Sequence, residues 1–255
     1  MQIQNLRDYG KACGIVLADQ QSILDDALTE IEATLFDSSE SLRAKFDDVM
    51  VESERIAYRR YLKAESLYGG KLLGRFFNDV LGHGVLNEKQ IEAAFADHFA
   101  LLDKFFLSLA QGRKSRAGAS FEFFHNSLFK KLGYPFEEQQ LLEDSKPDFL
   151  MPSGDYYQSN PLNSIVFTAK RTLRERWRQI TTEGTRGIGL YLATIDSKVT
   201  SQQLHHMVGH KIFLVVPDQI RRQHYPTATN VLSFAQFFED HLDPKMRIWK
   251  RDGIV

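Results

Sequence analysis

One stretch, from residue 146 to residue 183, constrains the fold of this chain more than any other. It contains a proline–aspartate pair, Pro147-Asp148, and then an apolar run over residues 164–169 that ends in Lys170. A lysine at the end of a buried strand is unusual, because an unpaired ammonium group is costly to bury. We therefore predict that Lys170 emerges at the end of a strand, beside anionic groups.

The residues after this strand have helical spacing. Leu173, Trp177 and Ile180 fall on one apolar stripe, and Glu183 falls on an adjoining stripe from which it can turn back toward the strand. An aspartate after a proline, a lysine at a strand end and a further carboxylate on the next helix together indicate a Mg²⁺-dependent phosphodiesterase site.

The order of these residues carries a family resemblance. Pro147-Asp148, then Lys170, then Glu183, with the triplet 174–176 (Arg-Glu-Arg) before the glutamate, is similar to the type II restriction endonucleases of the EcoRII, SsoII and PspGI group. That group belongs to the PD-(D/E)xK nuclease class and cuts within CCNGG or CCWGG targets. The resemblance has specific motifs over residues 112–225 and is general before them.

The chain departs from the broad nuclease class at one position. The residue two before the lysine is usually acidic in that class, and here it is Thr168. In the group that this chain resembles, the following helix supplies the missing carboxylate, which is the position that Glu183 occupies. A Pro-Asp pair alone is a weak signal, whereas the full arrangement is specific.

The resemblance and the chemistry of phosphodiester hydrolysis imply a catalytic set. Asp148, Glu183 and the backbone carbonyl of Ala169 would hold Mg²⁺ through hard oxygen ligands, and Lys170 would orient the attacking water and offset developing negative charge. Glu122 is a lesser candidate for completing the metal site, and a solvated helix charge is the alternative for it. The alternative for the whole set is a structural ion-pair network, but the order and spacing favour catalysis.

A second set of residues is predicted to contact DNA. Arginine donates two hydrogen bonds to guanine and glutamate accepts from cytosine, so Arg174, Glu175 and Arg176 suit a half-site of G·C pairs; the resemblance assigns them the same role. A glycine-flanked basic segment is composed for contacts to the DNA backbone or minor groove, through Gln111, Arg113, Lys114 and Arg116.

Related enzymes of the group extrude the central base pair of a five-base target, which requires a surface on which the flipped base can stack. The stretch 54–61 combines cations with aromatic residues on one expected helix, and its candidates are Arg55, Tyr58, Arg59 and Tyr61. An ordinary amphipathic helix with exposed arginines is the alternative, and the sequence leaves the two open.

Composition sets outer bounds. The 255 residues include 43% hydrophobic and 25% charged residues with a net charge of −1, which is ordinary for a globular chain and announces no nucleic-acid partner by itself. A near-zero net charge is mild evidence against DNA binding, but local clusters of basic residues can still contact DNA phosphates. The single cysteine, Cys13, excludes an internal disulfide and fits a reducing cytoplasm. No apolar run is long enough for a membrane span, and we expect a cytoplasmic protein.

The order of the expected elements is α/β. Residues 1–110 are expected to form a helical N-terminal region for dimerisation and DNA clamping, and residues 111–255 a nuclease core with a mixed five-stranded sheet flanked by helices. One helix is expected over 42–66, ending before the Tyr68-Gly69-Gly70 segment. A shorter helix is expected over 71–81. The helix after it should be capped by Asn87, with Gln90 at the capping-box position, and bury an apolar face made of Ile91, Phe95, Phe99, Leu102 and Phe106.

These observations predict a homodimeric, Mg²⁺-dependent endonuclease that cuts double-stranded DNA at a palindromic CCNGG-like site, with no small-molecule cofactor and no membrane. Each subunit of a two-fold dimer would read one half-site. Two alternatives remain open: a structure-selective DNA-repair nuclease of the same fold, and a non-catalytic DNA-binding module with a decayed site.

Overall fold

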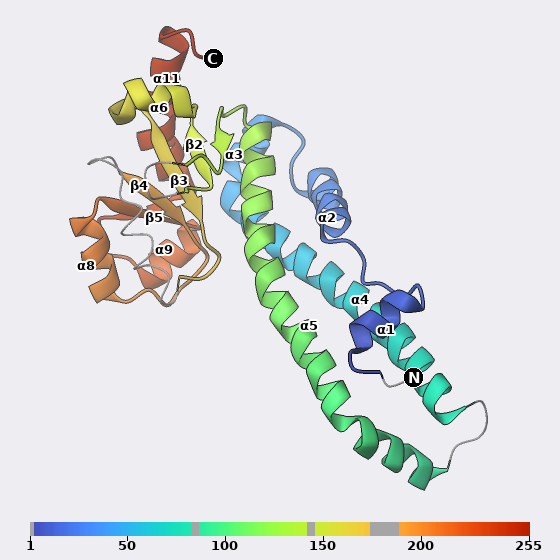
Figure 1. Cartoon of the computed structure of the whole chain (residues 1–255). Helices are drawn as coiled ribbons and strands as arrows, with labels where there is room; N and C mark the ends of the chain where they lie inside the picture. The colour runs from blue at the N-terminus through green and yellow to red at the C-terminus, as the bar shows by residue number, and fades with distance from the viewer. Residues whose placement is uncertain (1–2, 83–86, 142–145, 174–188) are drawn as a thin grey trace. The chain divides into compact units, whose positions relative to one another are not determined.

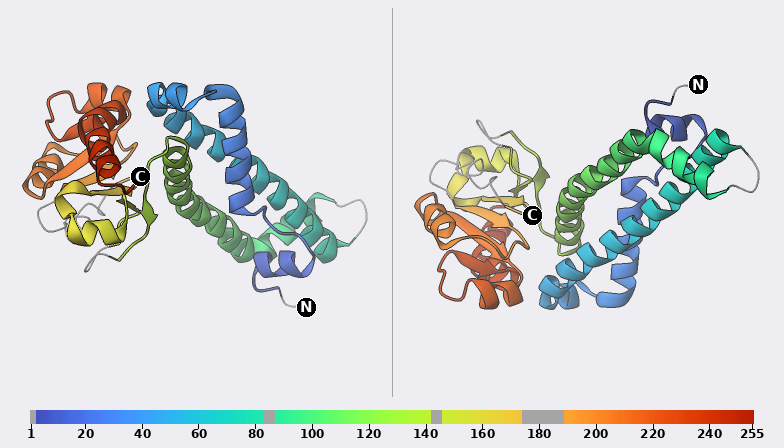
Figure 2. Two further views of the ribbon diagram at one scale, coloured as in Figure 1. Left: turned by 90° about the horizontal axis from the view of Figure 1, so that it is seen from above. Right: turned by 90° about the horizontal axis from the view of Figure 1, so that it is seen from below.

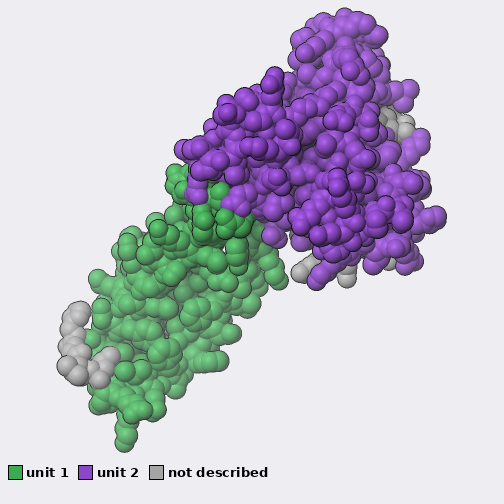
Figure 3. All heavy atoms as spheres, turned by 180° about the vertical axis from the view of Figure 1, so that it is seen from behind, with its two compact units in different colours: residues 1–27, 55–117 green, residues 28–54, 118–255 purple. Residues whose placement is uncertain are grey.

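The computed structural model describes residues 3–82, 87–141, 146–173 and 189–255 (Figure 1). The chain divides into two compact units (Figure 3). Unit 1 consists of Met1–Ala27 and Arg55–Ala117, and unit 2 of Leu28–Glu54 and Gly118–Val255. Three helices contribute residues to both units: α2 (Gln20–Leu35), α4 (Phe46–Leu81) and α5 (Glu88–Lys131). No helix in the described ranges has the length and apolarity needed to cross a membrane.

Unit 1 is helical around one apolar cluster. Helix α1 (Leu6–Ala12) packs there with α4 and α5, through Leu6, Tyr9, Tyr68, Leu72, Phe76, Leu102, Phe105 and Leu109. The predicted cap of α5 is confirmed: the Gln90 N–H donates to Asn87 Oδ1, and the Asn87 N–H donates to Gln90 Oε1, both at 3.0 Å.

Helix α4 does not end where the sequence predicts. It continues through Gly69 and Gly70 to Leu81, so the expected end before Tyr68 is wrong. Each glycine costs about 1 kcal/mol relative to alanine inside a helix. The buried side chains of Tyr68 and Leu72, on either side of the two glycines, supply packing that outweighs this local preference.

The expected buried face of α5 is also largely wrong. Of its five members only Leu102 is buried; the other four are exposed, namely Ile91 (42%), Phe95 (51%), Phe99 (71%) and Phe106 (54%). The buried stripe lies next to them on the helix and consists of Ala94, Leu102, Phe105 and Leu109. Apolar residues do recur at helical spacing, as the sequence predicts. However, α5 carries two neighbouring apolar stripes, and unit 1 covers only one of them.

Unit 2 is built on a mixed six-stranded sheet whose strands lie in chain order. They are β1 (Glu137–Glu138), β2 (Phe149–Met151), β3 (Ile165–Ala169), β4 (Leu190–Ala193), β5 (Ile212–Val216) and β6 (Val231–Ser233). The pairs β1–β2 and β2–β3 are antiparallel, and the remaining pairs are parallel. The predicted α/β fold with a mixed sheet is confirmed. The strand beyond the expected five is β6, which is too short to show an alternating pattern.

Both faces of the sheet are covered. Val166 belongs to an apolar cluster with side chains of α8 (Ser201–Gly209), whereas Phe167, on the opposite face, lies among aromatic rings that include Phe129 and Phe237. This is the alternation expected for a strand buried on both sides. The site described below lies where β2 begins and β3 ends.

The remaining helices of unit 2 close these layers. They are α3 (Ser39–Ala44), α6 (Gly154–Ser159), η1 (Pro161–Asn163), α9 (Asp218–His224), α10 (Phe234–Gln236), η3 (Phe237–Leu242) and α11 (Asp243–Arg251). Ser233 caps α10, since its side chain accepts from the Gln236 N–H. Figure 2 shows the red C-terminal helix beside the yellow segment, where Trp249 Nε1 donates to the Asn163 carbonyl at 2.8 Å.

Candidate functional site

The sheet register brings Asp148 and Lys170 together. Strands β2 and β3 pair with Phe149 opposite Phe167, so Asp148, just before β2, comes to the end of β3. Lys170 follows β3 directly, and its Nζ donates to Asp148 Oδ2 at 2.9 Å and to Oδ1 at 3.1 Å. The aspartate is buried, and the lysine side chain retains 25% exposure. The predicted emergence of Lys170 beside an anion is thus observed.

Two further groups fix the Asp148 carboxylate. The Thr168 hydroxyl donates to its Oδ2 at 2.7 Å, and the Ala169 N–H donates to the same oxygen at 2.8 Å. Sequence reasoning treated Thr168 only as a departure from an acidic pattern and missed this contact. In the structure, its hydroxyl orients the carboxylate of Asp148.

Glu122 joins the pair from α5. Lys170 Nζ donates to its Oε1 at 3.1 Å, so one ammonium bridges two carboxylates. Burial and the nearby charge of Asp148 raise the pKa of Glu122. Burial alone would lower the pKa of Lys170, but Asp148 and Glu122 together hold it above its ordinary value. The lysine therefore stays charged at neutral pH.

A second ion pair anchors the chain immediately after the lysine. Arg171 Nε donates to Glu54 Oε2 at 2.8 Å, and Ser120 Oγ donates to Glu54 Oε1 at 3.0 Å. Glu54 is buried, which raises its pKa despite these partners. No sequence pattern indicates this contact, because Glu54 and Arg171 lie 117 positions apart.

The backbone beyond Arg171 is held from the end of β4. Thr194 Oγ1 donates to the Arg171 carbonyl at 3.2 Å, and the Leu173 N–H donates to Asp196 Oδ2 at 3.0 Å. These contacts fix where the chain leaves the sheet toward its basic segment. The predicted base-recognition residues and the predicted helix carboxylate lie outside the described residues: Arg174, Glu175, Arg176 and Glu183.

The donor chemistry of the site suits a hard divalent cation. Two carboxylates, Asp148 and Glu122, converge on one point now held by the Lys170 ammonium, and carboxylate oxygens are the ligands that Mg²⁺ prefers. Within the described ranges, no three His, Cys, Asp or Glu side chains gather as a metal site. The third predicted ligand side chain, Glu183, is not among those ranges.

The predicted DNA-backbone residues in unit 1 have mixed surroundings. Gln111 and Lys114 are exposed on α5. Arg113 and Arg116 both pair with the buried Glu65: Arg113 Nε donates to its Oε1 at 2.8 Å, and Arg116 NH1 lies 3.7 Å from its Oε2. Glu65 therefore offsets much of the positive charge on which this prediction rests, and the prediction stays open.

The predicted base-stacking residues lie along α4. Arg55, Tyr58 and Arg59 are exposed at helical spacing, so they share one face. Tyr61 is buried, with the Arg116 guanidinium 5.6 Å from its ring centroid. Tyr58 is thus the aromatic member of the set whose ring is open to a ligand.

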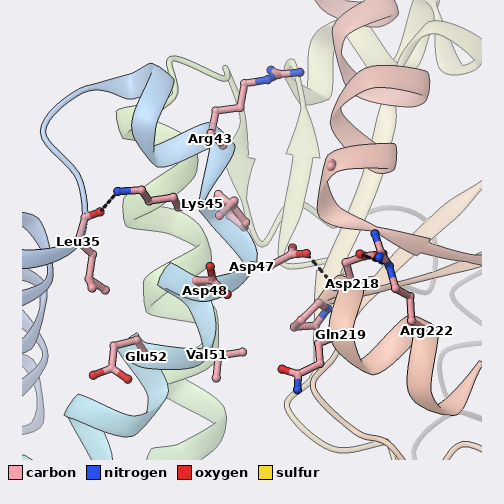
Figure 4. A pocket seen from close by; sticks show the side chains of 14 residues that line it. Leu35, Arg43, Lys45, Asp47, Asp48, Val51, Glu52, Asp218, Gln219 and Arg222 are labelled. Carbon is pink, nitrogen blue, oxygen red and sulfur yellow. Dashed lines mark hydrogen bonds and ion pairs between the residues drawn. The ribbon is translucent and has the colours of Figure 1, made fainter.

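Unit 2 also holds a pocket of about 730 Å³ between the first turns of α4 and α9 (Figure 4). Asp47 points toward α9 and accepts from the Asp218 N–H at 2.7 Å. Burial, with the charges of Asp218 and Asp48, raises the pKa of Asp47 to about 6. Among the residues that the structure describes, none that is predicted for catalysis or DNA contact lines this pocket.

Sequence comparison places the chain in a family. The family model described as EcoRII C terminal matches residues 81–238, a range that contains the Asp148–Lys170–Glu122 site. The chain belongs to the EcoRII C-terminal family. The resemblance inferred from the Pro-Asp, lysine and Arg-Glu-Arg arrangement is thereby confirmed.

Two curated relatives of this EcoRII C-terminal chain are type II restriction enzymes. SsoII from Shigella sonnei is 31% identical over 156 residues, which is 57% of this chain and 50% of SsoII. EcoRII from Escherichia coli is 29% identical over 187 residues, which is 71% of this chain and 41% of EcoRII. The chain thus spans about half the length of the curated relatives it matches.

Solved structures support the fold of this family member. Metal-depleted Ecl18kI in complex with uncleaved, modified DNA is similar with a TM-score of 0.81 and 20% identity, over 97% of this chain and 84% of that one. A PspGI–substrate DNA complex is similar with a TM-score of 0.63 and 21% identity, over 91% of this chain and 94% of that one.

Proposed function

We propose that this chain is a type II restriction endonuclease that hydrolyses phosphodiester bonds in DNA with Mg²⁺. The observation that carries the proposal is the Lys170 ammonium held between Asp148 and Glu122 where β2 begins and β3 ends. A lysine beside paired carboxylates meets the two needs of the reaction, cation ligands and a positive charge near the scissile phosphate. The curated relatives, which carry the name of such enzymes, point the same way.

In this proposal, Asp148, Glu183 and the Ala169 carbonyl would hold Mg²⁺, which supplies charge stabilisation and an acidified water. Lys170 orients that water and offsets charge on the phosphate. Its raised pKa keeps the ammonium protonated, so it acts as a donor rather than as a base. Thr168 keeps the Asp148 carboxylate in a fixed orientation through its hydroxyl contact. Glu122 is the alternative second metal ligand, in place of Glu183.

Specificity is assigned to the segment after Leu173. Arg174 and Arg176 would read guanines and Glu175 cytosines of a G·C half-site. A palindromic CCNGG-like target then calls for two copies of the chain, each reading one half. The contacts from Asp196 to Leu173 and from Thr194 to Arg171 support this assignment, because they fix the point from which the segment starts.

The experiment that tests the function is a digest of sequenced plasmid DNA with and without Mg²⁺. We expect discrete fragments that end at CCNGG-like sites and appear only with the cation. A smear would point to a structure-selective nuclease. Binding without cutting would point to a non-catalytic DNA-binding module. Either of these results would contradict the proposal.

We propose further that the central base of the target is extruded and stacks against α4. Arg55, Tyr58 and Arg59 are exposed on one face there, and stacking on an aromatic ring or guanidinium contributes about 1–3 kcal/mol per base. A 2-aminopurine at the central position should brighten when the protein binds, because an unstacked base fluoresces more strongly.

At saturating protein, Tyr58→Ala, Arg55→Ala or Arg59→Ala should lower that fluorescence more than Arg174→Ala does. Arg174→Ala serves as the control because it is expected to weaken binding rather than stacking. No change of fluorescence with the wild-type protein would rule out extrusion and, with it, the preference for a five-base target.

A further inference from the structure

Arg171 follows Lys170 directly and precedes the segment that is proposed to read bases. Its backbone is held at the carbonyl, which accepts from Thr194 Oγ1 at 3.2 Å. Its side chain is held at Nε, which donates to Glu54 Oε2 at 2.8 Å. The guanidinium is therefore fixed at both ends, and a ligand that binds it has little side-chain freedom left to remove.

The Glu54 carboxylate holds this guanidinium by one N–H group only. Its other oxygen accepts from Ser120 Oγ at 3.0 Å, so it is not shared with the arginine. Arg113, in contrast, donates both Nε and a terminal nitrogen to Glu65. In the part of the chain that the structure describes, the two terminal nitrogens of Arg171 have no hydrogen-bond partner, and its side chain is 38% exposed.

Stability of the fold is a poor explanation for this arrangement. A buried ion pair often contributes no more than apolar side chains of the same size would. Burial raises the pKa of Glu54, although Arg171 and Ser120 both act to lower it. An arginine that served only to neutralise Glu54 would gain most from a two-pronged contact. The single contact instead leaves the terminal N–H groups available to another acceptor.

The surroundings of Arg171 indicate which acceptor this is. The Cα atoms of consecutive residues are about 3.8 Å apart, so the arginine side chain starts beside Lys170. The planar fork of terminal N–H groups matches two oxygens of a phosphate. Glu54 is only 7% exposed, so the positive charge of the pair is the one that faces the surface.

We propose that Arg171, held in place by Glu54, binds a phosphate of the DNA backbone next to the phosphate that is cut. The contact rests on the proposed function, because that function brings DNA to Lys170. It would fix the strand beside the reacting phosphate and so limit the positions that this phosphate can take. Glu54 touches no DNA in this arrangement and is a positioning residue that acts through Arg171.

Binding of a cognate duplex tests the contact without cutting. Affinity is measured by fluorescence anisotropy over a series of salt concentrations, with no divalent cation present. Arg171→Ala should lower the affinity by about ten-fold or more. The slope of log affinity against log salt should become shallower by about 0.9 for each copy of the chain bound, because one phosphate contact is lost per copy.

Arg251→Ala is the matched control for this measurement. Arg251 Nε also donates to a carboxylate, that of Asp252 at 3.1 Å, and its side chain is 74% exposed. Its helix, α11, contacts Asn163, which precedes β3, whereas Arg171 lies after the end of β3. The control should change neither the affinity nor the salt slope.

Duplexes that carry one neutral methylphosphonate identify the acceptor. With the wild-type protein, this replacement next to the cut position should lower the affinity. With Arg171→Ala the same replacement should have no further effect, because the two partners of one contact are not additive. Equal losses in both proteins at every phosphate would contradict the assignment.

Glu54→Gln separates positioning from simple charge. Removal of a negative charge near DNA would by itself tighten binding, whereas release of the guanidinium should weaken it. We expect the affinity to fall, by less than in Arg171→Ala. The double variant of Glu54→Gln and Arg171→Ala should bind no more weakly than Arg171→Ala alone, since Glu54 acts through the arginine. Arg171→Lys, which keeps the charge without the fork, should restore part of the affinity.

Three results would overturn the inference: an unchanged salt slope in Arg171→Ala, an equal change in Arg251→Ala, or tighter binding by Glu54→Gln. A plasmid digest with the wild-type protein and Mg²⁺ separates this inference from the proposed function. Discrete cutting together with an unchanged slope in Arg171→Ala refutes the phosphate contact and leaves the nuclease intact. A shallower slope without any cutting supports the phosphate contact and refutes the nuclease.

Discussion

Asp148→Ala and Lys170→Ala are expected to slow DNA cleavage by about 10³-fold or more while leaving binding to the target largely unchanged. The two side chains contact each other at 2.9 Å, and in the proposed mechanism they act at the reacting phosphate rather than on the bases. Glu183→Ala should behave in the same way. Single-turnover cleavage rates and gel-shift affinities, measured on the same preparations, check the prediction.

Loss of fold must be separated from loss of chemistry in that experiment. Asp148→Ala leaves the Thr168 hydroxyl and the Ala169 N–H without their acceptor, whereas Asp148→Asn retains an oxygen to accept from them. The asparagine variant should therefore melt closer to the wild type and still fail to cut. Lys146→Ala is the matched lysine control, since Lys146 is exposed, and it should cut normally.

A graded variant tests the orienting contact. Thr168→Val removes one hydrogen bond to the buried carboxylate, and a bond to a charged group contributes about 1.5–3 kcal/mol. Cleavage should slow by less than in Asp148→Ala or Lys170→Ala.

Full activity in Glu183→Ala would show that Glu183 is not a metal ligand and would make Glu122 the second ligand.

Arg174→Ala and Arg176→Ala are expected to weaken binding to the cognate duplex strongly and to random DNA hardly at all. Each bidentate guanine contact contributes about 1–3 kcal/mol, and two copies make it twice, so the loss is about 2–6 kcal/mol, or about 30-fold to more than 10⁴-fold in affinity. Gel shifts on cognate and scrambled duplexes at one salt concentration give the ratio.

Lys114→Ala is the matched control for specificity, because Lys114 is exposed and is proposed to contact only the DNA backbone. It should lower affinity for both duplexes alike and reduce the salt dependence. An equal loss on both duplexes in the Arg174→Ala variant would show that this arginine contacts phosphate rather than a base.

The central pair of the site was predictable from sequence because its geometry is local. Asp148 and Lys170 lie at the ends of consecutive strands, and the antiparallel pairing of those strands brings them together. The hydroxyl contact of Thr168 follows from the same strand register. The sequence motif did not predict it, because a motif specifies residue types and not the hydrogen bonds between them. The Glu54–Arg171 ion pair depends on tertiary packing, which residue spacing does not encode.

The helices show where periodicity reaches its limit. A repeat of apolar residues says that a face will be covered, not what covers it. On α5, the side chain of Phe105 is covered by its own unit, whereas that of Phe99, six residues earlier, is not. A glycine likewise ends a helix only when no packing outweighs its low helix propensity. In α4, the packing of Tyr68 and Leu72 lets the helix continue past Gly69.

One ammonium shared by two carboxylates leaves the described site with an excess of negative charge. A DNA phosphate that approaches this surface is repelled until a cation balances the charge, and a cation gains a further anionic neighbour when the phosphate arrives. Thermodynamic reciprocity then requires each to raise the affinity of the other by the same factor. In the proposed mechanism, the carboxylates needed for cutting thus also weaken binding to DNA when no cation is present, so addition of the cation should tighten binding as well as permit cleavage.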